Sequence, residues 1–352
     1  MLTHLLRQHL PDWLRPFARK VRRALMPTPS YAAQLEFERA NFDKQTQVHE
    51  LPPIFHYWSN TYLRPMLEEF GFSNPDQFFV KYLLLAASRT GRAQLRFLSI
   101  GAGNCDTEVR IAQALRHAGL DNFCIDCLEL SPVMLARGHA DAQSKGVGAH
   151  LKFTQGDFNN WRASTDYDSV LANQSLHHVS ALEHLFDAVK SSLHANGLFL
   201  TSDIIGRNGH MRWPESLAIV QRFWQELPES YRYNQQLRRH EKQYKNWDCS
   251  HEGFEGIRAQ DVLPEMIKRF NFKLFIAASS VVDIFIDRSF GHHFDVNNPR
   301  DTDLIDRIHA YDEQALASVE LTPTRLFAVM TLTPETSSYS RGLRPENCVR
   351  RP

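Results

Sequence analysis

The sequence predicts an α/β fold built on a mainly parallel sheet, and residues 95–117 give the clearest indication. The apolar run Leu95–Ile100 is typical of a buried strand, and the turn Gly101-Ala102-Gly103 follows at once. A helical pattern comes next, with Asp106 or Thr107 expected as its cap. Strands and helices then alternate over roughly a hundred residues, as they do in parallel sheets. Glycines at the carboxyl end of a strand let the backbone approach a ligand closely.

Each later element is predicted from its own local pattern. Strand two, Phe123–Leu128, ends at Glu129, and Ser131-Pro132 start the next helix with a cap residue and a proline at its first position. Ser180 and Glu183 predict a capping box for the helix after strand four. The remaining strands are expected at residues 151–154, 169–172, 198–205, 274–286 and 326–332. We therefore expect seven strands with helices on both faces.

The residues after the glycine turn separate two classes of cofactor. In the dinucleotide pattern G-x-G-x-x-G, the third glycine would fall at Asp106, where a carboxylate would repel a pyrophosphate. A ligand that has an ammonium group and no phosphate, such as S-adenosylmethionine, would not be repelled. Glu129, at the end of strand two, is placed to accept hydrogen bonds from a ribose diol. Asp157 can accept from an adenine amino group, and Phe158 can lie against the purine.

Four short motifs together resemble those of the class I S-adenosylmethionine-dependent methyltransferases. They are Gly101-Ala-Gly103, Glu129-Leu-Ser-Pro, Gly156-Asp-Phe and Asn173-Gln-Ser-Leu-His-His, in that order. The similarity is greatest to the small-molecule branch, whose fourth strand ends in Leu-His-His. It covers residues 90–205 and implies a Rossmann-like sheet and methyl transfer to a small acceptor. By position, the resemblance implies that the cofactor contacts Gly101, Ala102, Gly103, Glu129, Leu130, Gly156, Asp157, Phe158, Asn173 and Ser175.

The chain departs from this family at two positions and offers candidate catalytic residues at two others. The family often has an acid where Ser99 stands and a third glycine where Cys105 stands, which leaves the contacts to the cofactor's amino group open. His177 and His178 follow strand four at the edge where the transferred methyl group should lie. An imidazole titrates near neutral pH, so we expect His177 to take a proton from the acceptor. The alternative is that both histidines only shape the pocket.

Composition excludes several other classes of protein. The 352 residues contain 40 basic and 40 acidic side chains, so net charge gives no indication of nucleic-acid binding. Five scattered cysteines and the absence of a long apolar run indicate a cytoplasmic protein. Cys124 and Cys127 should point to opposite faces of a strand, and His292, His293 and Asp295 fit a loop better than a metal centre. We therefore expect no metal site.

We divide the chain into six parts. Residues 1–30 form a basic segment, 31–90 a helical cap, 91–205 the cofactor-binding core, 206–260 a helical insertion, 261–332 the end of the core sheet and 333–352 a disordered tail. The basic segment favours packing on its own domain, with a peripheral membrane contact through residues 1–26 as the alternative. The aromatic segment 51–62 is expected to form either a lid over the pocket or an ordinary packed helix.

The insertion is expected to cover the substrate. It is rich in aromatic and basic residues: Trp213, Phe223, Trp224, Tyr231, Tyr233, Tyr244 and Trp247, with Arg207, Arg212, Arg222, Arg232, Arg238, Arg239, Lys242 and Lys245. Such a surface suits a sugar-like or anionic acceptor. Two other functions stay open, a non-catalytic methyltransferase-like domain that serves a partner protein and a nicotinamide-dependent oxidoreductase. The missing third glycine disfavours the oxidoreductase.

Overall fold

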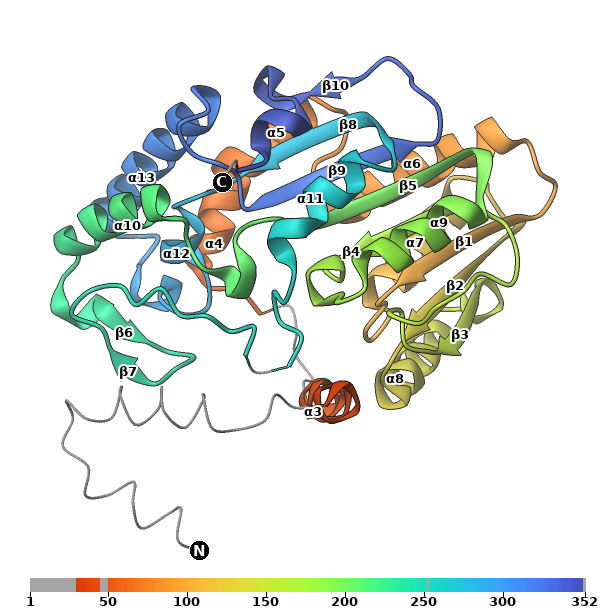
Figure 1. Ribbon diagram of the computed structural model, residues 1–352, viewed down its shortest axis with the longest axis horizontal. Coiled ribbons are helices and arrows are strands. Elements are labelled where there is room, and N and C mark those ends of the chain that lie inside the picture. The colour runs from red at the N-terminus through yellow and green to blue at the C-terminus, as the bar shows by residue number, and fades with distance from the viewer. Residues whose placement is uncertain (1–29, 45–49, 252, 351–352) are drawn as a thin grey trace, which may run out of the picture.

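The computed structural model describes residues 30–44, 50–251 and 253–350, so the predicted basic segment lies outside them except for Ser30. Eight strands form the central sheet: β1 (Leu95–Ile100), β2 (Phe123–Glu129), β3 (Leu151–Gln155), β4 (Tyr167–Asn173), β5 (Leu193–Ile204), β8 (Asn271–Ala278), β9 (Arg325–Thr331) and β10 (Ser338–Tyr339). Their order across the sheet is β10-β8-β9-β5-β4-β1-β2-β3 (Figure 1). The β1–β4 neighbourhood is where the strand order reverses.

Only β9 runs against its neighbours. It pairs antiparallel with β5 and with β8, while the β3-β2-β1-β4-β5 half is parallel throughout. The predicted mainly parallel α/β fold is therefore confirmed. The sheet has one strand more than the expected seven, because β10 from the chain's end pairs parallel with β8.

Helices cover both faces of the sheet (Figure 1). The helices of the described residues are α3 (Tyr31–Lys44), α4 (Pro53–Trp58), the π-helical turn η1 (Ser59–Leu63), α5 (Arg64–Glu68), α6 (Pro75–Thr90), α7 (Asp106–His117), α8 (Pro132–Ser144), α9 (Leu182–Ser192), α10 (Pro214–Glu226), α11 (Ala259–Ile267), α12 (Asp283–Ile286) and α13 (Pro299–Ala317). Single 3₁₀ turns are η2 (Gly148–His150), η3 (Leu176–His178), η4 (Asn208–His210), η5 (Glu229–Arg232), η6 (Gly291–His293), η7 (Ser340–Gly342) and η8 (Pro345–Cys348). Among the described residues, no helix is long and apolar enough to cross a membrane.

Alternation along the central strands divides the apolar core into two layers. In β1, Phe97 packs with the buried residues of α6, α7 and α8, whereas Leu98 and Ile100 pack with those of α9 and α11. The neighbouring β4 does the same, with Leu171 in the first layer and Val170 in the second. Side chains of a strand point alternately to opposite faces, so these apolar runs fit strands buried on both sides. Because β1 and β4 are buried on both faces, the positions of their carboxyl ends are fixed relative to the helices.

One predicted helix start is correct and two are wrong. Ser131 caps α8 as expected and accepts a hydrogen bond from the backbone N–H three residues on. Asn74 caps α6 in the same way. The start of α7 differs, because its cap position is Cys105, which has a positive φ of 58° and makes no capping hydrogen bond. The expected capping box of Ser180 and Glu183 does not form, since α9 begins at Leu182 without a side-chain cap.

The insertion and the chain's end also differ from expectation. Within residues 206–260, only α10 and the first residues of α11 are α-helical, and a two-stranded hairpin forms from β6 (Tyr233–Asn234) and β7 (Arg239–His240). The tail predicted to be disordered is ordered up to residue 350. Arg341 donates to the carbonyl oxygen of Ala277 at 2.6 Å, and Cys348 is buried. Serine, proline and arginine content was therefore a misleading guide here.

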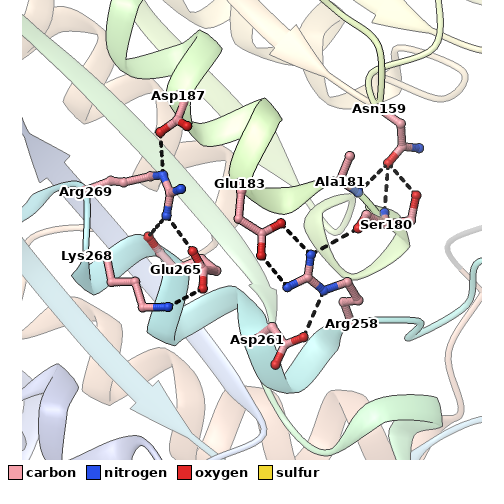
Figure 2. A network of polar contacts seen from close by, with 10 residues as sticks. All are labelled: Asn159, Ser180, Ala181, Glu183, Asp187, Arg258, Asp261, Glu265, Lys268 and Arg269. Carbon is pink, nitrogen blue, oxygen red and sulfur yellow. Dashed lines mark hydrogen bonds and ion pairs between the residues drawn. The ribbon is translucent and has the colours of Figure 1, made fainter.

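Arg258 joins the end of the insertion to α9 (Figure 2). Its guanidinium donates to both carboxylate oxygens of Glu183 at 2.6 and 2.7 Å, and to Asp261 at 2.8 Å. The partner that replaces the expected capping box is Asn159, whose Oδ1 accepts from the backbone N–H groups of Ser180 and Ala181. Bidentate arginine–carboxylate pairs are among the stronger polar contacts in proteins.

We predict that Arg258→Leu lowers the free energy of unfolding by about 1–2 kcal/mol, because several charge-assisted hydrogen bonds are lost and solvent screens the pair with Glu183. Urea denaturation would measure this. The control is Arg307→Leu, whose ion pairs with Glu226 and Asp303 lie on the surface. We expect it to change stability by about 0.5 kcal/mol or less. Equal losses in the two variants would contradict a special role for Arg258.

Candidate functional site

A cavity of about 1050 Å³ lies where the parallel strands end. Ligands of open α/β sheets bind at this edge, at the point where the strand order reverses. Most of the predicted cofactor residues line the cavity, namely Gly101, Ala102, Gly103, Glu129, Leu130, Asp157, Phe158, Asn173 and Ser175. Gly156 does not. Its N–H donates to the carbonyl oxygen of Glu129 at 3.0 Å, and a Cβ there would come within 2.8 Å of Leu128 Cδ1.

The glycine turn forms a tight cradle at the end of β1. Gly101 has a φ of 68°, and a Cβ at this position would lie 2.6 Å from the Cβ of Ser175. Ser175 is fixed in turn, because its Oγ donates to the carbonyl oxygen of Ile100 at 2.7 Å. A side chain at Gly101 would therefore both strain the backbone and fill the space above the turn.

Glu129 holds two elements that border the cavity. Its Oε2 accepts from the backbone N–H of Gly103 at 3.0 Å, and its Oε1 accepts from that of Ser131 at 2.9 Å. Burial raises the pKa of this carboxyl, although these backbone donors oppose the shift. Glu129 thus connects the glycine turn to the start of α8. Each carboxylate oxygen of Glu129 keeps a second lone pair that could accept from a ribose hydroxyl. The contact to a ribose stays a prediction.

Helix α3 reaches the predicted adenine side of the cavity. The hydroxyl of Tyr31 donates to Asp157 Oδ2 at 2.6 Å, and the backbone N–H of Asn159 donates to Asp157 Oδ1 at 2.9 Å. Leu35, Glu38 and Phe42 of the same helix line the cavity. The carboxylate expected to meet an adenine is therefore also a contact of α3, and the helical cap covers this end of the site.

Ser99 is paired with an acid from α7. Ser99 Oγ donates to Glu108 Oε1 at 2.6 Å, and Glu108 is almost fully buried at the cavity wall. Its Oε2 is buried and has no hydrogen-bond partner among the described residues. Burial raises the pKa of this carboxyl to about 7, against the opposing hydrogen bond from Ser99. An unpartnered buried carboxylate oxygen beside the glycine turn fits the ammonium group of S-adenosylmethionine.

Three imidazole rings surround one carboxylate in the cavity, beyond the end of β4. Glu255 Oε1 lies 2.5 Å from His210 Nε2 and 3.5 Å from His177 Nε2, while its Oε2 lies 3.6 Å from His178 Nε2. On its other side, His177 Nδ1 contacts Asp203 Oδ1 at 2.6 Å. The sequence-predicted pair of histidines is therefore found at the site, joined by partners that sequence reasoning did not propose.

Carboxylates dominate the electrostatics of this group. Burial alone would lower the pKa of His177, but Asp203 and Glu255 outweigh it and raise that pKa to about 10. Burial alone would raise the pKa of Glu255, but its hydrogen bonds with His177 and His210 outweigh burial and hold that pKa far below its usual range. Burial lowers the pKa of His210 more than Glu255 raises it. A pKa raised in this direction favours the protonated ring, and the role of His177 as a base stays a prediction.

The predicted covering segments contribute to the cavity in part. Leu51, Phe55, Trp58 and Ser59 line it, whereas the rest of the segment 51–62 does not. From the basic residues of the insertion, Arg212 and Lys245 line it. Other insertion arginines are engaged elsewhere. Arg207 lies over the Trp213 ring and Arg239 over the Trp247 ring, each at 5.2 Å from the centroid.

Five residues of the site escaped the sequence analysis, and they are Glu38, Glu108, Asp203, His210 and Glu255. Asp203 stands near the carboxyl end of a predicted strand, which is a usable signal for a site residue in a parallel sheet. The others lie on helices or irregular segments. No spacing in the sequence relates them to β1 or β4.

Comparison with known proteins identifies the core. Residues 98–199 match the methyltransferase domain family. No curated protein matches the chain. A solved S-adenosylmethionine-dependent methyltransferase from Clostridium acetobutylicum ATCC 824 is 14% identical, with 44% of this chain and 63% of that chain covered and a TM-score of 0.31.

Two further solved structures are similar over more of their length. An O-methyltransferase from a trans-AT polyketide synthase multienzyme of Brevibacillus brevis, in complex with S-adenosyl-L-homocysteine, is 13% identical, covering 86% of this chain and 88% of that one (TM-score 0.41). Geranyl diphosphate C-methyltransferase from Streptomyces coelicolor A3(2) is 11% identical, covering 87% and 100% (TM-score 0.45). At such identities the likeness concerns the fold alone. The family match spans the glycine turn, Glu129 and the two histidines, so the part of the chain that builds the cavity edge of the parallel strands is similar to the methyltransferase domain family.

Proposed function

We propose that this protein transfers a methyl group from S-adenosylmethionine to a hydroxyl group of a small, sugar-like acceptor. One observation carries the proposal. The cavity is continuous from the glycine turn, past His177, to a wall that the insertion builds from Asn234, Gln236 and Trp247. A molecule bound against that wall would meet the methyl donor beside the histidines.

The chain's own residues do mostly positioning work in this reaction. S-adenosylmethionine supplies a methyl group that its sulfonium already activates, so catalysis needs chiefly proximity and alignment. The glycine turn, Glu129 and Glu108 would hold one end of the cofactor, and Asn173 and Ser175 would flank its reactive side. We further propose that His177 and His178 face the reacting group of the acceptor, since they follow Ser175 in the chain and line the same cavity.

The far wall of the cavity favours a neutral, hydroxylated acceptor over a strongly anionic one. Arg212 is buried and pairs with Asp283 at 2.7 Å, so its charge is already compensated. Amide groups beside aromatic rings give the directional hydrogen bonds and flat apolar faces that suit a sugar ring. The carboxylates near His177 would also oppose an anion there.

Two alternatives are less well supported. A nicotinamide-dependent oxidoreductase would need a dinucleotide at the start of α7, whose first turn instead carries Asp106 and Glu108. A non-catalytic domain that serves a partner protein would bind the cofactor without transferring its methyl group. Incubation with labelled S-adenosylmethionine and a panel of hydroxylated small molecules tests the proposal, and cofactor binding without transfer to any acceptor would favour the non-catalytic alternative.

We predict that Glu129→Ala weakens the binding of S-adenosylhomocysteine by about 1.5–3 kcal/mol, because hydrogen bonds to a charged group are lost. Isothermal titration calorimetry measures the affinity, and thermal unfolding checks that the variant is folded. Asp121→Ala is the control, since this exposed carboxylate pairs with Arg116 just before β2. Unchanged affinity in a folded Glu129→Ala protein would show that Glu129 does not contact the cofactor.

We predict that S-adenosylhomocysteine binds more weakly as the pH falls through the pKa of Glu108. That pKa is about 7, and an ammonium ligand favours the ionised carboxylate, so binding below pH 7 must displace a proton. The dissociation constant should rise about eightfold from about pH 7.5 to about pH 6. Glu108→Gln should bind more weakly and with little pH dependence. A variant that keeps the wild-type pH dependence would rule out Glu108 as its source.

We predict that S-adenosylhomocysteine slows amide exchange in α3 and α4 and in residues 206–258, because these segments border the cavity on the side away from the sheet. Hydrogen-exchange mass spectrometry with and without the ligand measures this. Peptides from the second half of α13 serve as the internal control, since they do not line the cavity. If the cavity segments and the control peptides respond alike, they are fixed cover and no closing lid is present.

A further inference from the structure

The imidazoles beyond β4 are arranged as ligands around a single point. One ring nitrogen each of His177 and His210 and one carboxylate oxygen of Glu255 all lie within 4.8 Å of one another. Ligands of a four-coordinate ion held at about 2.0–2.2 Å stand about 3.3–3.6 Å apart. The 3.5 Å between His177 and Glu255 meets this spacing, and the 2.5 Å between His210 and Glu255 would need to open by about 1 Å.

The outer partners of these side chains match those of metal sites. A ligating histidine usually gives its other ring nitrogen to a carboxylate, which fixes the ring and its tautomer. Asp203 does this for His177, at 2.6 Å from Nδ1. Asp203 is itself held by the backbone N–H groups of Ser175 and Leu176 at 2.9 and 2.7 Å. The Nε2 atom of His177 is thereby aimed at the shared point.

The charge of the cluster also calls for a cation. Three carboxylates gather here, because Glu38 contacts His178 Nδ1 at 2.9 Å beside Asp203 and Glu255. In the described part of the chain, the ion pairs of these three carboxylates are all with imidazoles. With neutral rings, three negative charges would stand close together at this site. A divalent ion would compensate most of that charge without protonating the rings.

We propose that His177, His210 and Glu255 bind a divalent transition-metal ion. Two imidazoles and one carboxylate are the donor set of Zn²⁺ and Fe²⁺ sites and disfavour Mg²⁺, which prefers oxygen ligands alone. Three protein ligands leave coordination positions open toward the cavity. The sequence led us to expect no metal site. The proposed site revises that expectation, and it does not involve His292 or His293.

The role of the ion rests on the proposed function. The acceptor hydroxyl would bind at the open coordination positions of the ion. A bound cation lowers the pKa of such an oxygen, so its proton can leave to water in the cavity. The oxygen then forms its bond to the methyl carbon while the carbon–sulfur bond breaks. That electron pair stays on sulfur, which leaves S-adenosylhomocysteine and the methylated acceptor. In this role the metal takes the place of the imidazole base expected from the sequence.

The test is direct binding of Zn²⁺ to the full chain after treatment with a chelator and its removal. Calorimetry should show one site per chain for Zn²⁺ and none for Mg²⁺ at the same concentrations. His210→Ala and the isosteric Glu255→Gln should each weaken Zn²⁺ binding at least about a hundredfold, whereas His292→Ala, an exposed histidine outside the cavity, should not change it. Circular dichroism confirms that the variants are folded.

The outcomes separate the metal site from the proposed function. Failure of the wild-type chain to bind Zn²⁺, or equal affinity in wild type and folded Glu255→Gln, would overturn the site. Zn²⁺ binding without methyl transfer to any acceptor would leave the site standing and remove the proposed function. If methyl transfer is found and runs equally fast in metal-free protein, the role of the ion toward the acceptor is wrong. S-adenosylhomocysteine affinity, measured in parallel, should be the same in all these variants within about threefold.

Discussion

The buried carboxylate of Asp203 is the interaction on which the site depends. It accepts backbone hydrogen bonds from Ser175, Leu176 and Ile204 at 2.7–2.9 Å and contacts the ring of His177. A fully buried charge is stable only with such a set of partners, and removing one would leave the rest uncompensated. Asp203 therefore joins the turn after β4 to the end of β5. That turn carries Ser175, His177 and His178, which we propose to contact the cofactor and the acceptor.

Around this fixed turn, the remaining site residues come from distant parts of the chain. Glu38 lies on α3, His210 in η4, and Glu255 in the irregular segment before α11. The separation between Glu38 and His178 is 140 residues. Arg258 holds the last of these segments against α9, three residues after Glu255 (Figure 2). The polar network at α9 is thus part of how the site is built, and one of its members, Asn159, lines the cavity.

What the sequence predicted well follows from local physics. The strand Leu95–Ile100 and the turn at Gly101 are set by apolar burial and by a backbone conformation that glycine adopts readily, and both are visible in a few residues. The place of Glu129 at the cavity was predictable because the carboxyl end of a strand in a parallel sheet lies at the ligand-binding edge. Pairings between distant residues were not predictable. The capping box of Ser180 and Glu183 does not form, because Asn159, from another segment, accepts hydrogen bonds from the backbone N–H groups of Ser180 and Ala181.

The position of Glu108 shows how one site property can move between elements. The resemblance seen in the sequence implied an acid at the end of β1, where this chain has Ser99, and Glu108 reaches Ser99 from the helix at 2.6 Å. The deeper placement costs solvation, which is why the carboxyl titrates near neutrality. At the other end of the site, the carboxylates Glu38, Asp203 and Glu255 are paired with three imidazoles. Nine carboxylates and five lysine or arginine side chains line the cavity as a whole, so its wall is more acidic than a chain with no net charge would suggest. Many of the arginines are held in ion pairs and ring contacts elsewhere.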